Sequence, residues 1–141
     1  MRSLIVTFLI YLLLANSNCS REELSSTQLS GNKWIFESVN NEEIVTREAP
    51  YLQFTRNDSE YIISGFLGCN RFQGSAIITD SHIELSPLAM TRMYCEQTDS
   101  LERSIVSMLH ESLSYELEGN KLKLTSSDGI IAELYLELGD N

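Results

Sequence analysis

The last third of the chain alternates apolar and polar residues around two short turns, and this pattern constrains the fold more than any other feature. Leu122 and Leu124 fall on one face of their segment, and Lys121 falls on the other. Alternation of apolar and polar residues with a period of two indicates strands that have one face exposed to solvent. The dipeptides at 119–120 (Gly-Asn) and 128–129 (Asp-Gly) tolerate positive φ and predict hairpins. We therefore predict an antiparallel meander. Its strands are residues 113–117, 121–125 and 130–138.

Earlier segments predict further short strands and a single helix. The strands are residues 34–39, 51–55, 61–65, 75–79 and 82–85. Leu101, Ile105 and Met108 recur at helical spacing within residues 100–112. Asp99 is the expected N-cap, and Glu102 is expected to complete a capping box. Strands, one helix and more strands predict an α+β domain, in which an antiparallel sheet curves into a partial (half) barrel packed against one α-helix.

The first 18 residues are typical of a signal peptide. Arg2 precedes an uncharged apolar run over residues 4–15, and small polar residues follow it. A membrane-spanning helix needs about 20 apolar residues, which this run does not supply. We therefore expect an exported protein of the bacterial cell envelope, either periplasmic or held at the outer membrane.

Cys19 decides between these two locations. Acylation of this cysteine would make the protein a lipoprotein, although Asn16 and Asn18 match a lipobox imperfectly. An ordinary cut after Ser17 would leave a free thiol. An odd cysteine at the start of an exported chain favours the lipid anchor.

The expected organisation is a signal peptide, a polar tether and one domain, at residues 1–18, 19–30 and 31–141. The 141 residues include 10 Lys and Arg against 20 Asp and Glu, a formal net charge of -10. Such a surface excludes nucleic-acid binding through phosphate contacts, and it should repel anionic headgroups. Membrane association would therefore depend on the acyl anchor alone.

Residues 65–74 hold three of the seven glycines and predict a tight turn. Asn70 is expected to cap this turn through its own side chain, and Arg71 to form a structural ion pair. An anion site at Arg71 is the alternative. The glycine spacing does not match a phosphate-binding loop.

Cys69 and Cys95 are expected to pair, because thiols oxidise in an exported compartment. Two buried free thiols are the alternative.

Several segments together resemble the META domain family, which includes HslJ-like heat-shock lipoproteins. They are Trp34, the Pro-Tyr-Leu-Gln-Phe run at 50–54, Gly-Cys-Asn-Arg-Phe at 68–72, Thr-Arg-Met-Tyr-Cys at 91–95, and Glu102. The resemblance covers about residues 29–138. Tyr94 departs from the family pattern, which often has a small residue there. The resemblance implies a half-barrel with a helix and bridged cysteines, and it implies no shared enzymatic activity.

We expect a non-enzymatic, stress-related accessory protein that binds a lipid, another hydrophobic ligand or a peptide of an envelope protein on the concave half-barrel face. The candidate ligand face is Trp34, Phe54, Phe66 and Phe72. No cofactor and no metal site are expected, because neither His82 nor His110 has ligand spacing. One alternative is a small envelope hydrolase that uses His82 or Glu102. The other is a purely structural or inhibitory module.

Overall fold

The computed structural model describes residues 28–58 and 60–138, which form strands and one long helix. The predicted signal peptide and Cys19 lie outside the described residues. The elements are β1 (Lys33–Val39), β2 (Glu42–Glu43), β3 (Tyr51–Asn57), β4 (Glu60–Phe66), β5 (Arg71–Ile78), β6 (His82–Leu85), β7 (Ala89–Met90), α3 (Asp99–Leu109), β8 (Leu113–Glu118), β9 (Lys121–Ser126) and β10 (Ile131–Leu136).

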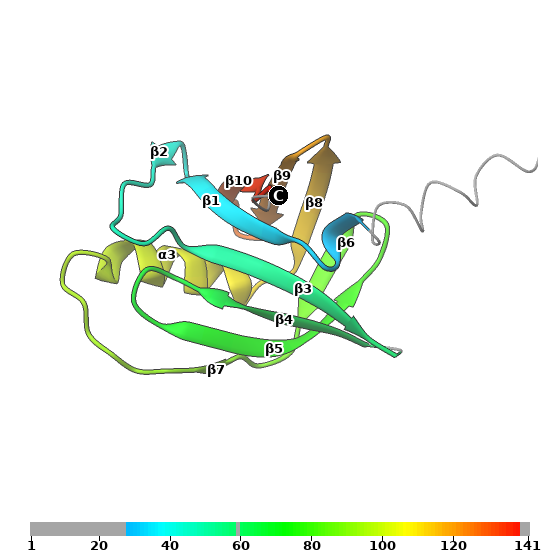
Figure 1. The fold of residues 1–141 in the computed structure, drawn as a ribbon, viewed down its shortest axis with the longest axis horizontal. Helices are drawn as coiled ribbons and strands as arrows, with labels where there is room; N and C mark the ends of the chain where they lie inside the picture. The colour runs from blue at the N-terminus through cyan, green and yellow to red at the C-terminus, as the bar shows by residue number, and fades with distance from the viewer. Residues whose placement is uncertain (1–27, 59, 139–141) are drawn as a thin grey trace, which may run out of the picture.

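The sheet closes into a barrel of eight strands, so the predicted half-barrel is wrong, whereas the α+β mixture is correct. Neighbouring strands follow the order β10-β9-β8-β6-β5-β4-β3-β1, and β1 also pairs with β10. The register of that closing pair shifts between Phe36 and Ser38. Such a bulge bends a strand and increases its twist. β1 can therefore pair with both β3 and β10, and these two pairings close the ring (Figure 1).

The predicted C-terminal meander is confirmed. β8 pairs with β9 and β9 with β10, both antiparallel, and Gly119 has the expected positive φ of 60°. Leu122, Leu124 and Leu134 are at most 1% exposed and line the barrel core. The final strand ends at Leu136, two residues earlier than predicted, and Leu138 is exposed.

The glycine-rich block is mostly strand rather than turn. Gly65 lies in β4 and Gly74 in β5, so only residues 67–70 turn. A Cβ on Gly65 would lie 2.1 Å from the backbone oxygen of Tyr51, and one on Gly74 would lie 2.6 Å from Leu88 Cδ2. These two glycines allow close packing, and Gly68 alone among the three has positive φ.

The helix α3 packs its apolar side into the barrel core, as predicted. Ile105, Met108 and Leu109 are buried in the same cluster as the strand side chains. α3 contacts β1 and β9, and it begins at Asp99 and ends three residues before the predicted end. Within residues 28–58 and 60–138, no helix has the length and apolar character needed to cross a bilayer.

The folded domain begins earlier than the predicted boundary at residue 31. Leu29 is completely buried, and its backbone oxygen accepts a hydrogen bond from Trp34 Nε1 at 3.3 Å. Ser30 forms a β-bridge with Phe54. Leu29 and Ser30, which the sequence analysis assigned to the tether, therefore pack with the barrel.

Candidate functional site

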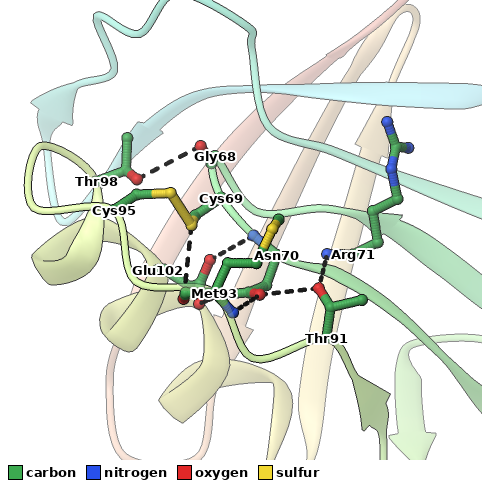
Figure 2. The surroundings of a disulfide bond; sticks show 9 residues. All are labelled: Gly68, Cys69, Asn70, Arg71, Thr91, Met93, Cys95, Thr98 and Glu102. Atoms are coloured by element: carbon green, nitrogen blue, oxygen red, sulfur yellow. Dashed lines mark hydrogen bonds between the residues drawn. A yellow bond between two sulfur atoms is a disulfide. The ribbon is translucent and has the colours of Figure 1, made fainter.

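A disulfide joins the turn between β4 and β5 to the segment that leads into α3. Cys69 and Cys95 have Cα atoms 5.9 Å apart and their sulfurs are bonded (Figure 2). We call residues 86–98 the crossover segment, because they run from the end of β6 along β5 to the start of α3. The bond ties this segment to the barrel at its carboxyl end, and Thr98 Oγ1 adds a hydrogen bond to the Gly68 oxygen at 3.4 Å.

The Asn70 side chain hydrogen-bonds to the crossover segment, whereas the sequence predicted that it would only cap its own turn. Its Oδ1 accepts hydrogen bonds from Thr91 Oγ1 at 2.8 Å and from the Met93 N–H at 2.7 Å. Its Nδ2 donates to the Met93 oxygen at 2.9 Å and to Glu102 Oε1 at 2.6 Å. Asn70 is only 3% exposed. Every hydrogen-bonding position of this buried amide is therefore occupied (Figure 2).

Glu102 connects α3 to the same turn, and the predicted capping box is wrong. Its Oε2 accepts the backbone N–H of Asn70 at 2.8 Å, in addition to the side-chain bond at Oε1. The N-cap residue is Thr98 rather than Asp99, and it makes no side-chain cap bond. The carboxylate bonds here because buried Asn70 offers it two donors, the side-chain amide and the backbone N–H, where capping would supply only one. We call Cys69, Asn70, Cys95 and Glu102 the junction.

The crossover segment and α3 enclose an open groove of about 580 Å³, which we call the β7–α3 groove. Residues 88 and 90–94 line one side, and α3 with its C-cap contributes Glu102, Arg103, Val106 and His110 to the other. Met93 and Tyr94 are 60% and 77% exposed at its edge. The walls of this groove thus combine apolar side chains with basic and other polar groups, and the junction holds the crossover segment against α3.

The four residues of the expected ligand face do not form a surface. Trp34, Phe54 and Phe72 belong to the barrel core and are at most 4% exposed. Phe66 is 8% exposed, and the Arg71 guanidinium lies 5.4 Å from the centre of its ring. Closure of the sheet turns the expected concave face into the packed interior, so this expectation is wrong.

The remaining candidates lie apart from the groove or on its rim. Arg71 donates to Tyr51 at 3.2 Å and lies 3.9 Å from Glu48, which agrees with an exposed structural ion pair. His82 Nδ1 is 2.8 Å from Ser81 Oγ, and no hydrogen bond in the described part of the chain links it to Glu102. His110 lines the groove. Among the described residues, no three His, Cys, Asp or Glu side chains are placed to hold a metal ion.

Sequence reasoning missed Arg92, Met93 and Tyr94 as candidate site residues. They stand in the Thr-Arg-Met-Tyr-Cys piece, which was used only for the family resemblance. The available signal was two large apolar residues beside a cysteine, in a stretch with neither helical nor strand periodicity. Such residues have no core position of their own, and in the structure they are exposed.

Comparisons with known proteins agree on one family. The model of the META domain matches residues 27–135. The "Heat shock protein HslJ" of Escherichia coli (strain K12) is 30% identical over 128 residues, which cover 87% of this chain and 89% of the relative.

Two solved NMR structures share the fold. One is 30% identical with a TM-score of 0.64, covering 76% of this chain and 91% of its own. The other, from Burkholderia xenovorans, has a TM-score of 0.65 at 17% identity, with 82% and 88% of the two chains covered. At this lower identity the likeness concerns the fold alone.

Proposed function

We propose that this chain, which belongs to the META domain family, is an exported accessory protein that acts by binding and not by catalysis. Its binding site is the β7–α3 groove, and its ligand is a hydrophobic molecule or peptide of the bacterial cell envelope. The sequence of residues 1–18 supports export, and a disulfide is typical of oxidising compartments. The relative named as a heat shock protein supports a role in stress.

One observation carries the proposal: Met93 and Tyr94 are exposed, although Asn70 hydrogen-bonds the Met93 backbone and the disulfide at Cys95 anchors the residue after Tyr94. Large apolar side chains on a fixed segment gain contacts on binding and lose little conformational freedom. The groove beside them also has an apolar wall at Val106 on α3 and Leu88 on the crossover segment. A fixed apolar edge over a hollow is typical of binding sites.

The chemistry of the two acid–base candidates supports binding over catalysis. Both carboxylate oxygens of Glu102 accept hydrogen bonds from Asn70, so this group is engaged in holding α3 to the turn. His82 lies on β6 and contacts Ser81, its neighbour in the chain. A general acid or base must reach a substrate proton, and both oxygens of Glu102 already accept hydrogen bonds within the junction.

A second hollow of about 410 Å³ lies over β4, β5 and β6 and supplies a matched control. Ile77 lines it and is 66% exposed, and its rim includes Glu60 and Glu84. A substitution at Ile77 therefore removes an exposed apolar side chain of similar exposure outside the β7–α3 groove.

The test is a titration of the purified domain with anilinonaphthalene sulfonate, an anionic apolar dye. We expect saturable fluorescence enhancement, and Tyr94→Ser should weaken it about fivefold because part of an aromatic contact is lost. Ile77→Ser should bind the dye as the natural protein does. Equal effects of the two substitutions, or no saturable binding at all, would contradict the proposal. Near-UV circular dichroism checks that both variants keep the native packing.

A further inference from the structure

The outer edge of β7 presents unpaired backbone groups to the groove. β7 pairs with β5 so that Met90 lies opposite Phe72, and the Thr91 N–H donates to the Arg71 oxygen at 3.1 Å. In an antiparallel ladder, hydrogen-bonded and non-hydrogen-bonded pairs alternate. Since Thr91 bonds toward β5, the N–H and C=O of Met90 point the opposite way, toward the groove.

The same alternation continues to Arg92. The Met93 N–H is directed to Asn70, as the Thr91 N–H is directed to Arg71, so the backbone groups of Arg92 point outward between them. Outside the strand ladders, no backbone hydrogen bond in the described part of the chain uses the N–H or C=O of Met90 or Arg92, and within the ladder the alternation turns those of Met90 away from β5. Two residues with free donors and acceptors, spaced by two, are the template on which another strand can pair.

This edge differs from the edges of the barrel strands. Each of the eight barrel strands has a strand partner on both sides, because the ring is closed. β7 lies off that ring and pairs with β5 alone, as the lowest ribbon in Figure 1 shows. Residues 88 and 90–94 line the groove along this edge, so a segment added there would lie between β7 and α3.

The charge of the groove selects the kind of segment. The chain as a whole has a formal net charge of -10, yet the groove is lined by Arg92, Arg103 and His110. Arg103 pairs with Asp99 at 2.7 Å, whereas Arg92 has no ion pair within the described residues. The one carboxylate of the lining, Glu102, is bound by two donors of Asn70. An acidic group is the partner that this rim attracts.

We propose that the β7–α3 groove binds an extended peptide segment, which pairs with the outer edge of β7 as an added strand and places a carboxylate at Arg92. Alternate side chains of such a strand face Val106 and solvent, so the favoured segment alternates apolar and acidic residues. This inference rests on the proposed function, because it identifies the ligand of the same groove. The backbone supplies affinity, and Arg92 supplies the preference for acidic peptides.

The test uses a fluorescent peptide of about seven residues, a usual strand length, that alternates valine with glutamate. Its binding to the purified domain is followed by fluorescence anisotropy. Two further peptides carry methyl groups on the backbone nitrogens of either the odd or the even residues. Alternate N–H groups of a strand face opposite edges. We expect one methylated peptide to bind about tenfold more weakly and the other to bind like the parent.

Charge is tested separately with Arg92→Glu and a matched control, Arg56→Glu, which alters an exposed arginine at the far end of β3. Arg92→Glu should weaken the parent peptide about fivefold and favour a peptide with lysine in place of glutamate. Arg56→Glu should change neither. Equal effects of both variants, or equal binding of the two methylated peptides, would overturn the added strand.

The dye titration keeps the two proposals apart. Binding of anilinonaphthalene sulfonate without binding of the peptide would overturn the peptide ligand and leave the groove as a hydrophobic site. Binding of neither probe would overturn both proposals. Binding of both probes, with the expected preference of the peptide for one methylation pattern, supports both proposals.

Discussion

The C-terminal meander and the junction differ in the sequence separation of the contacts that stabilise them: the contacts are local in the meander and long-range in the junction. In the meander, each strand pairs with the next one through a short turn, as in the pair Glu118 and Lys121. In the junction, the disulfide joins residues 26 positions apart, and Asn70 bonds to Glu102 across 32 positions. The meander therefore has a local sequence pattern, whereas the junction depends on four residues that meet only in the folded barrel.

This difference predicts how each region responds to substitution. Loss of a turn residue in the meander changes a local backbone preference, which costs little free energy. Loss of a junction residue leaves buried groups without partners and releases a long segment. Three substitutions test this contrast, and the expected loss of unfolding free energy falls from the first to the last.

Removal of the disulfide should have the largest effect. The double variant Cys69→Ala and Cys95→Ala should lose about 3.5 kcal/mol of unfolding free energy, because the unfolded chain regains the freedom of a loop of this length. Urea denaturation measures the loss. Amide hydrogen exchange in residues 91–98 should become much faster than in β9, because the released segment can open locally whereas β9 exchanges through global unfolding. Equal exchange rates in both regions of the variant would break the distinction between junction and meander.

Asn70→Ala should destabilise the domain by about 2 to 3 kcal/mol, because it leaves the Glu102 carboxylate and the Met93 backbone short of partners in a buried place. Thermal and urea denaturation measure the change. Asn120→Ala, in the exposed hairpin of the meander, is the matched control and should stay within about 0.5 kcal/mol of the natural protein. A loss at Asn120 as large as that at Asn70 would contradict the contrast.

Gly119→Ala should cost about 1 kcal/mol, the smallest of the three effects. Gly119 has φ of 60°, and nothing lies within 4 Å of a Cβ placed there, so the cost comes from backbone strain alone. Gly119→Asn should cost less, since asparagine adopts this conformation more readily. If the alanine variant lost as much stability as Asn70→Ala, the meander could not be described by local preferences.

The same contrast explains which predictions from the sequence succeeded. The strands over residues 113–117 and 121–125 were predicted nearly to the residue, because alternation and turn chemistry are encoded within a few positions. The apolar stripe of α3 was also correct. The capping box at Glu102 was wrong because the pattern of a local cap was present, but a distant amide competed for the carboxylate.

Closure of the barrel was the main feature that the sequence analysis missed. Trp34 lies opposite Leu136, so the two ends of the domain are in contact. No local sequence pattern in β1 or β10 predicts this pairing. Once the ring is closed, Trp34, Phe54 and Phe72 become core residues. The candidate binding surface then lies outside the barrel, where the crossover segment meets α3.

The sequence alone determined the meander, the amphipathic helix α3 and the resemblance to the META domain family, because each depends on residue types at short, fixed spacing. The tertiary structure decided the closed ring, the partners of Asn70 and Glu102 and the exposed edge of β7. These features arise from contacts between residues far apart in the chain, and their energies depend on which buried groups find partners once the core has packed.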